Sequence, residues 1–219
     1  MNNPIKPTLK SEIIPLVLII ATILLSIFFY PMLPEKMISH WDFQGQANGW
    51  MPKLFNTILF PCIITACYLL FLVMPYFDPR KERYAEFRGA YNIFKIAIIG
   101  VLFIVYLASL LANLGLPINI GKIVSLVIGL LMIILGNYMS KIKFNWFMGI
   151  RTPWTMSSEV VWNKTHRVGG WFFILFGLCI IISPYLPVIW ATIIFIGGVL
   201  LATVGSMVYS YIVYRQEQK

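Results

Sequence analysis

Six long apolar runs, separated by short polar segments, dominate the pattern of hydrophobic and polar positions along the chain. They cover residues 13–30, 55–77, 96–116, 121–139, 168–183 and 188–214. About 20 apolar residues are needed for a helix to cross the hydrocarbon core of a bilayer. The first run is long for a signal peptide, and no small-residue cleavage site follows it. The pattern therefore predicts an all-α polytopic membrane protein with six transmembrane helices.

The polar segments between the runs predict the orientation of these helices. Fourteen of the 17 Lys and Arg residues fall on one side of the six runs, and three fall on the other. Lys and Arg accumulate on the cytoplasmic side of membrane proteins. We therefore expect cytoplasmic N and C termini, a cytoplasmic loop 140–167 and an outer loop 31–54. The loops divide the chain into a two-span unit, 1–77, and a four-span unit, 78–219.

The composition agrees with a membrane protein and narrows the function classes. Charged residues make up only 11% of the chain, against about a quarter in soluble domains. The net charge of +9 follows from the topology, so we expect no direct contact with nucleic acid. The cysteines Cys62, Cys67 and Cys179 lie in apolar runs and match no metal or disulfide spacing. We expect no metal and no cofactor.

Small residues and turns indicate how the helices pack. Short turns near residues 115–119 and 183–187 predict antiparallel pairing of the third run with the fourth and of the fifth with the sixth. The interiors of the runs contain no Asp, Glu, Lys, Arg or His, which disfavours a proton-driven carrier. Two stripes of small residues allow close helix approach: Gly198, Ala202, Ser206 and Ser210 in the last run, and Gly121, Ser125 and Gly129 in the fourth.

The outer loop carries one group of candidate binding residues, His40, Trp41 and Trp50. His40 and the nearby Asp42 would give two metal ligands where a stable site needs about four. We therefore expect His40 to make a local hydrogen bond and the two tryptophans to anchor at the outer headgroups. The same residues are candidates for contact with a ligand outside the cell.

The loop 140–167 carries the second group of candidates. Gly149 and Pro153 predict a turn, and Thr155 or Ser157 can cap a short helix over residues 158–167. Arg151 could pair with Glu159 or reach a lipid phosphate. The loop is either an interfacial amphipathic segment or a partner-binding surface. Four residues of the predicted helix share one face at spacings of three and four: Glu159, Trp162, Asn163 and His166. The full set of candidates in this loop is Arg151, Thr152, Pro153, Trp154, Glu159, Trp162, Asn163, His166 and Arg167.

Catalysis is not expected. No Ser or Cys is placed beside a base and an orienting acid, and the chain has neither an HExxH motif nor a glycine-rich phosphate loop. Glu159 and His166 are separated by about 10 Å along a helix axis. The sequence therefore favours a binding protein over an enzyme.

Two stretches of the chain resemble a known family. The outer segment LPEKMISHWDFQGQANGW and the loop motif GIRTPWT at residues 149–155, followed by Val161 and Trp162, are similar to the SdpI family of bacterial membrane proteins and to the uncharacterised N-terminal domain often found with it. The resemblance implies a six-span plasma-membrane protein that protects its cell from a secreted toxic peptide outside. It also implies capture of a soluble transcriptional repressor inside, as in the founding system. A transporter or envelope-maintenance protein for a lipid or small amphiphile is the alternative.

Overall fold

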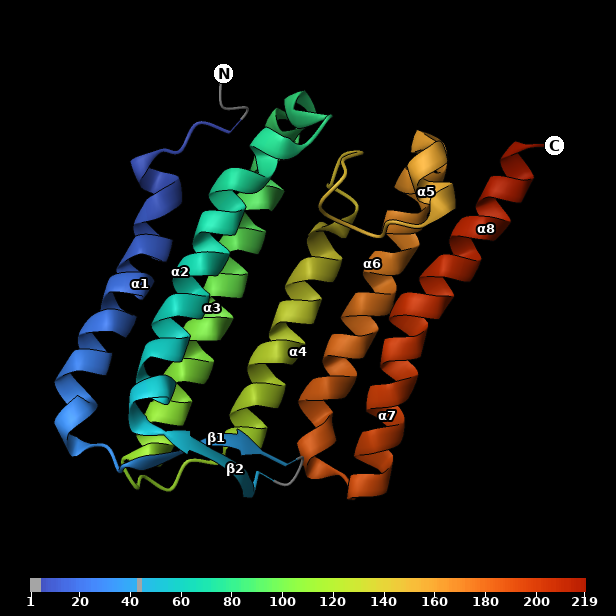
Figure 1. Cartoon of the computed structure of the whole chain (residues 1–219). Helices are drawn as coiled ribbons and strands as arrows, with labels where there is room; N and C mark the ends of the chain where they lie inside the picture. Colours follow the sequence, from blue (N-terminus) through green and yellow to red (C-terminus); the bar gives the residue numbers. More distant parts are fainter. Residues whose placement is uncertain (1–4, 43–44) are drawn as a thin grey trace.

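The computed structural model describes residues 5–42 and 45–219, and long helices standing side by side form most of it (Figure 1). Within these residues, six helical segments are long and apolar enough to cross a membrane. This confirms the prediction of an all-α polytopic protein. The spans are α1 (Leu9–Phe29), α2 (Lys53–Phe77), α3 (Arg88–Asn113), α4 (Ile120–Met139), α6 (Glu159–Ile182) and a last span made of α7 (Val188–Leu200), a π-helical turn (Leu201–Gly205) and α8 (Ser206–Glu217).

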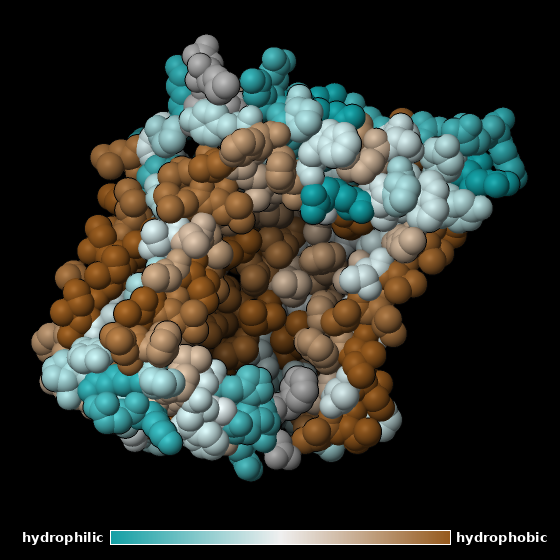
Figure 2. Space-filling view, in the orientation of Figure 1, coloured by the Kyte–Doolittle hydropathy of each residue, from teal (hydrophilic) through white to brown (hydrophobic). Residues whose placement is uncertain are grey.

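Apolar and polar surfaces are separated along these helices. Figure 2 shows hydrophobic residues along the sides of the helices and hydrophilic residues gathered at both ends. The start of α1, the α4–α6 connection (residues 140–158) and the C-terminus lie at one end, and a small β-hairpin lies at the other (Figure 1). We call these ends the loop side and the hairpin side.

Helices α1 and α3 begin several residues before the apolar runs that predicted them. Thr8 caps α1 through a capping box with Ser11, so the helix starts at Leu9. Helix α3 starts at Arg88. Glu12 and Lys95, which hydropathy placed outside the spans, therefore lie within these helices. Both are buried, and the Lys95 Nζ donates to Glu12 Oε1 at 2.6 Å. The interiors of the apolar runs hold no ionisable side chain, as the sequence shows, but the helices extend beyond the runs and bury this charged pair near the loop-side end of α1.

The predicted short helix over residues 158–167 and the predicted short fifth span are one continuous helix, α6. Ser158 is its N-cap and accepts a hydrogen bond from the Val161 N–H. A separate short helix, α5 (Pro153–Ser157), precedes it and is capped by Thr152. The loop motif therefore continues without a break into a span of 24 residues.

Helices α4 and α6 meet through glycines. A Cβ on Gly136 would lie 2.5 Å from the Gly170 carbonyl oxygen, and one on Gly177 would lie 2.5 Å from the Gly129 carbonyl oxygen. Such backbone contact is the close packing that small residues permit in membranes. The predicted stripe in α4 thus packs at Gly129, whereas Gly121 lies against Gly45 of the hairpin.

The predicted stripe in the last span packs against α6. A Cβ on Gly198 would lie 2.0 Å from the Phe176 ring, and the Ser206 Oγ is 3.3 Å from the position of a Cβ on Gly169. Ala202, Ser206 and Ser210 are buried.

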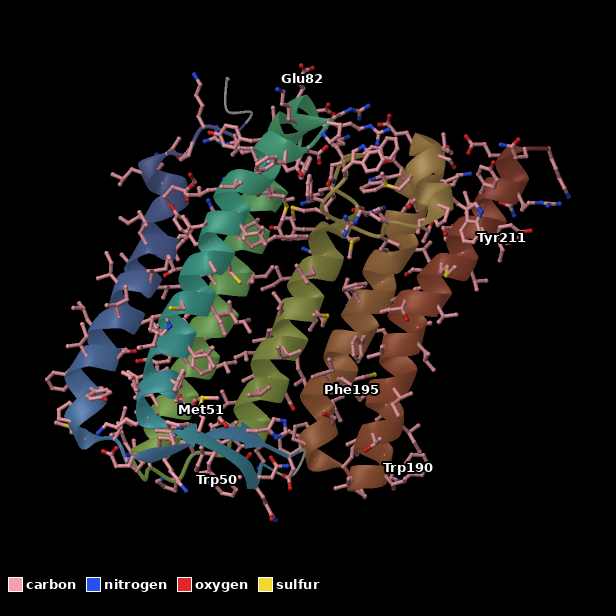
Figure 3. The ribbon with its side chains drawn as sticks, viewed as in Figure 1. Trp50, Met51, Glu82, Trp190, Phe195 and Tyr211 are labelled. Carbon is pink, nitrogen blue, oxygen red and sulfur yellow. The ribbon has the colours of Figure 1, made fainter. Side chains whose placement is uncertain are left out.

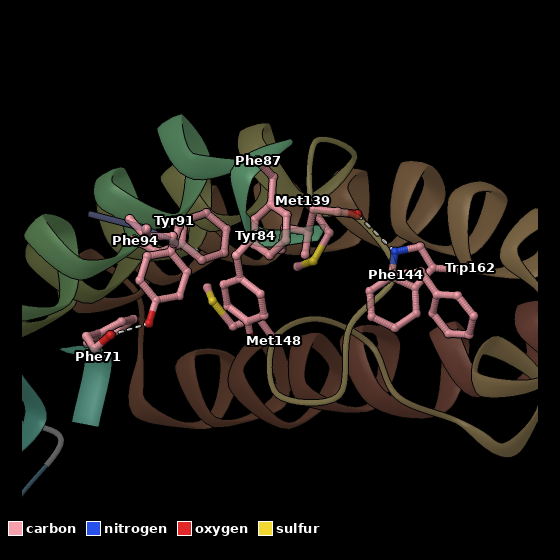
Figure 4. Packing of buried hydrophobic residues seen from close by; sticks show 11 residues of the cluster. Phe71, Tyr84, Phe87, Tyr91, Phe94, Met139, Phe144, Met148 and Trp162 are labelled. Atoms are coloured by element: carbon pink, nitrogen blue, oxygen red, sulfur yellow. Dashed lines mark hydrogen bonds between the residues drawn. The ribbon is translucent and has the colours of Figure 1, made fainter. Parts of the chain in front are cut away.

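A buried aromatic cluster joins α2, the short helix η2 (Lys81–Ala85) and α3 (Figure 4). Pro75 lies inside α2 and has no N–H for the Phe71 carbonyl four residues earlier. The Tyr91 hydroxyl on α3 donates to that carbonyl at 2.5 Å. The hydrogen bond lost to proline is therefore replaced from the neighbouring helix, which fixes the register between α2 and α3.

The loop between the first two spans, which was predicted to lie outside, forms an antiparallel hairpin of β1 (Lys36–Trp41) and β2 (Ala47–Pro52). The turn-forming composition did not predict this hairpin. The Asn113 side chain at the end of α3 accepts from the Ile38 N–H at 2.7 Å and donates to the Ile38 carbonyl at 3.1 Å. Met37 and Leu33 are buried against Tyr106. The hairpin therefore closes the end of the bundle.

Candidate functional site

The α4–α6 connection, residues 140–158, is a folded loop built around Asn145. The Asn145 side chain is fully buried. Its Oδ1 accepts from the N–H groups of Phe147 and Met148 at 2.8 and 2.7 Å, and its Nδ2 donates to the carbonyls of Lys143 and Met148 at 2.8 and 3.0 Å. Because all donors and acceptors of a buried amide are used, the turn has one defined conformation.

Trp162 packs beneath this loop instead of facing outward. Its side chain is 0% exposed, and its Nε1–H donates to the Ile142 carbonyl at 2.9 Å. The ring stacks on His166, with centroids 3.9 Å apart. It also packs at a tilt against Phe144 (Figure 4). The shared face of α6 that the sequence suggested as a contact surface is therefore an interior face at Trp162 and His166.

His166 fixes the start of the GIRTPWT motif. Its Nε2 accepts from the Ile150 N–H at 2.9 Å, and its Nδ1–H donates to the Trp162 carbonyl at 2.8 Å. These two bonds require the neutral ring with the proton on Nδ1. Gly149 has φ +108°, and a Cβ there would lie 2.2 Å from His166 Nε2. The position therefore demands glycine for its backbone conformation and for space.

Glu159 is held by a partner that spacing could not reveal. Arg83 of η2 donates to both Glu159 carboxylate oxygens, at 2.6 and 2.8 Å. This hydrogen bonding raises the pKa of the Arg83 guanidinium. Of the two alternatives considered for Arg151, the pair with Glu159 is absent among these contacts, because Arg151 donates to the Trp146 carbonyl at 2.5 Å within the loop itself.

A second connection joins the loop to the α2–α3 turn. Asp78 is buried, and its Oδ2 accepts from the Tyr84 hydroxyl and the Trp146 N–H, both at 2.9 Å. Burial, together with the Asp78 carboxylate, raises the pKa of Tyr84. The Arg80 guanidinium lies 3.5 Å from the centre of the Phe144 ring. The two loop-side turns thus pack together, and the sequence gave no signal of this contact because Asp78 and Trp146 are 68 positions apart.

The remaining candidates divide by exposure. Thr152 and Trp154 are partly buried against the last span, through a 2.9 Å hydrogen bond to Ser210 and a ring contact with Tyr211. Trp146, which is 49% exposed, lies beside Arg151 and Arg80. The candidates that face outward on the loop side are Arg151, Pro153, Asn163 and Arg167.

The candidates of the loop between α1 and α2, His40, Trp41 and Trp50, lie at the opposite ends of the helices. Figure 3 shows Trp50 on the hairpin side and Glu82 and Tyr211 on the loop side. Trp50 is 58% exposed, Trp41 is partly buried, and His40 is exposed with its Nδ1 2.5 Å from Asn48 Oδ1. The local hydrogen bond expected for His40 is present. Elsewhere in the described ranges, His, Cys, Asp and Glu form no group of three that could hold a metal ion.

The six apolar spans define a multi-pass protein of the cell membrane. Residues 141–210, which include most of the folded loop and the helices beneath it, match the model of the SdpI/YfhL protein family. Residues 17–65 match that of a domain of unknown function, DUF1648. Both resemblances that the motifs indicated, to the SdpI family and to its N-terminal domain, are therefore confirmed.

The similarity to one curated relative extends along almost the whole chain. The sequence is 29% identical over 208 residues to the immunity protein SdpI of Bacillus subtilis (strain 168), covering 95% of this chain and 98% of the relative. No solved structure matches.

Proposed function

We propose that this protein is a membrane immunity protein that protects its cell from a toxic amphipathic peptide and has no catalytic role. The observation that carries this proposal is its similarity to the immunity protein SdpI along 98% of that relative. The folded loop supports it, because a rigid exposed surface suits binding, whereas no nucleophile with a base was identified in the sequence.

The proposed orientation places the loop side and both termini in the cytoplasm and the hairpin outside. The Lys and Arg asymmetry supports this arrangement. Single cysteines at Asn48 and Ser158, in a chain without its native cysteines, should differ in labelling by an impermeant thiol reagent. In intact cells we expect labelling at position 48 alone. Labelling at position 158 alone would reverse the orientation.

Within this orientation the two groups of exposed residues have different roles. His40, Trp41 and Trp50 would contact the peptide outside. Arg151 and the neighbouring Trp146 would contact a soluble partner inside, which the family resemblance suggests is a transcriptional repressor. The proposed units, 1–77 and 78–219, separate these surfaces, although α3 packs against helices of both units.

A transporter for a lipid or small amphiphile is the second candidate, and one observation favours it. The buried Glu12–Lys95 pair places ionisable groups inside the helix bundle. Such groups often mark ion or substrate pathways in membranes. A carrier driven by the proton gradient would lose its effect when the gradient collapses, whereas a binding protein would not.

The test is protection of a sensitive host challenged with a toxic amphipathic peptide. Membrane damage would be measured by entry of an impermeant DNA dye, with and without a mild uncoupler, and compared with the empty vector under each condition. Equal relative protection supports binding. Protection that disappears with the gradient, in a protein still inserted at normal abundance, would favour the transporter.

Partner capture needs its own variant and control. Arg151→Ala should release a fluorescently tagged repressor candidate from the membrane, because Arg151 is exposed. Lys141→Ala, an exposed change at the start of the same loop, is the matched control. Equal membrane localisation in the wild type and Arg151→Ala would contradict the proposed role of the loop.

A further inference from the structure

A groove of about 410 Å³ opens between α1 and α2 close to the hairpin side. This volume lies in the range of about 300–1,000 Å³ typical of small-ligand sites. Most of its wall residues are exposed apolar side chains, so the groove continues into the lipid-facing surface of the protein. Its walls include Ile23, Ile27, Tyr30, Leu54, Ile58 and Cys62.

The polar groups inside the groove already have partners. The Ser26 hydroxyl is 2.9 Å from the Tyr106 hydroxyl, and the Thr57 hydroxyl donates to the Lys53 carbonyl at 2.8 Å. With these hydroxyls satisfied, the groove offers apolar surface to an occupant. It therefore suits a hydrocarbon chain better than a polar molecule.

A positive charge lies at the mouth of the groove. Lys53 is the first residue of α2, and its Nζ is 4.6 Å from the centre of the Tyr30 ring that lines the groove. Its carboxylate partner Glu35 is 3.5 Å away and its side chain is 92% exposed. The Lys53 side chain itself is only 11% exposed, so its charge is largely shielded from water, whereas the long contact to so exposed a carboxylate contributes little. The N-terminus of α2, which has no side-chain cap, adds positive potential.

We propose that this groove binds one phospholipid with an anionic headgroup from the leaflet on the hairpin side. One acyl chain would fill the groove, and the phosphate would replace Glu35 beside Lys53. The bilayer is the occupant that the structure supports, because the groove opens sideways into the apolar surface of a cell-membrane protein. The proposal goes beyond immunity and does not depend on it.

The test is lipid retention by the full-length purified protein in native mass spectrometry, using dioleoyl-phosphatidylglycerol and dioleoyl-phosphatidylcholine as probes. We expect one tightly retained phosphatidylglycerol. Ile58→Trp should fill the groove and abolish retention, whereas Leu70→Trp, at another exposed position on α2, should not. Lys53→Gln should weaken retention of phosphatidylglycerol about fivefold and that of phosphatidylcholine less, because the choline group already offsets the charge of its phosphate. Lys36→Gln, exposed on the hairpin, is its control.

Two further measurements separate the contribution of the acyl chain from that of the headgroup. Inorganic phosphate should not compete with phosphatidylglycerol, and dioleoylglycerol should bind more weakly. Equal binding of dioleoylglycerol and phosphatidylglycerol would overturn the headgroup contact at Lys53. Retention that survives Ile58→Trp, or is lost equally in Leu70→Trp, would overturn the groove. A dimer that Ile58→Trp dissociates would show that a second copy of the chain occupies it.

Cys62 gives a readout that needs no groove-filling variant. It lines the groove, and with Cys67→Ser and Cys179→Ser it is the remaining thiol. Phosphatidylglycerol added to delipidated protein should slow alkylation of Cys62 by a lipid-soluble maleimide. An unchanged rate, while native mass spectrometry still shows a bound lipid, would place that lipid elsewhere.

Discussion

The α1–α3 bundle and the α4–α6 pair achieve helix association by opposite means. In the first, buried polar side chains join the helices: Glu12 to Lys95, Ser26 to Tyr106, and Tyr91 to the Phe71 carbonyl. In the second, glycines bring two backbones into contact. Lipid tails are as apolar as leucine, so hydrophobic burial alone does not drive the helices of either group to associate.

The two means differ in what they demand of the sequence. A buried ion pair must be matched on both helices, because one partner alone leaves an uncompensated charge. A glycine contact depends on the absence of a side chain, so almost any substitution breaks it. The first bundle should therefore tolerate paired replacement, and the second should tolerate none.

The largest expected effect comes from Glu12→Ala. Lys95 would remain buried without a partner, which costs about 3–5 kcal/mol. The double variant Glu12→Leu/Lys95→Met removes both charges and should recover most of this loss. Unfolding in detergent titrated with SDS, followed by circular dichroism, measures both. If the double variant is less stable than Glu12→Ala, an unpaired buried Lys95 is not the cause of the loss.

Gly136→Leu should cost about 3 kcal/mol, because the Gly170 backbone cannot move aside as a flexible side chain could. No compensating change on α6 should restore stability, unlike the ion pair. Gly197→Leu on α7 is the control, since no atom lies within 4 Å of a Cβ there. The same SDS titration applies. Equal stability of the two variants would contradict backbone contact between α4 and α6.

Gly149→Ala tests the loop itself. The methyl group would meet His166 Nε2, and the backbone at φ +108° disfavours alanine. We expect a loss of about 2–3 kcal/mol, confined to the loop. Limited proteolysis between residues 140 and 158 should accelerate while the spans stay protected. Gly89→Ala, which meets no atom within 4 Å, should leave the proteolysis pattern unchanged, and acceleration in both would indicate global destabilisation.

The spans could be predicted because the bilayer imposes length and apolarity on each of them. Their starts could not, because hydropathy assigns Glu12 and Lys95 to the outside, and only the partner helix shows that the charges match. The hairpin was missed for a similar reason. Its backbone is satisfied partly by Asn113, which lies 75 residues away from Ile38.

The candidate site shows the same limit. Helical spacing correctly placed Trp162 and His166 on one face of the helix. That face was interpreted as an exposed contact surface because polar groups on a helix usually mark the solvent-facing side, whereas both side chains are buried. Here the loop lies over that face and its Ile150 N–H and Ile142 carbonyl bond to the two side chains. Asn145, Asp78 and Arg83 gave no sequence signal, since their partners become neighbours only after the two turns fold together.

The smallest expected effect comes from Arg83→Ala, which removes the pair with Glu159 on the loop side. The Arg83 and Glu159 side chains are 33% and 43% exposed, so solvent screening should limit the loss to about 1 kcal/mol or less. This contrasts with the buried Glu12–Lys95 pair although both have a 2.6 Å contact. High salt should weaken the exposed pair and leave the buried one unaffected.

The pH dependence of the stability that Arg83 contributes provides a further test of the exposed pair. Because the pKa of Arg83 is raised on folding, its contribution is complete below its ordinary pKa and is lost only as the pH rises through the higher folded value. Titration of Arg83 should therefore not alter the difference between wild type and Arg83→Ala between about pH 6 and about pH 9. SDS titrations at both pH values, with Lys81→Ala as an exposed control on the same turn, measure it. If Arg83→Ala loses as much stability as Glu12→Ala, the Arg83–Glu159 pair is shielded from water. The contact between η2 and α6 would then be as strong as the contacts within the α1–α3 bundle.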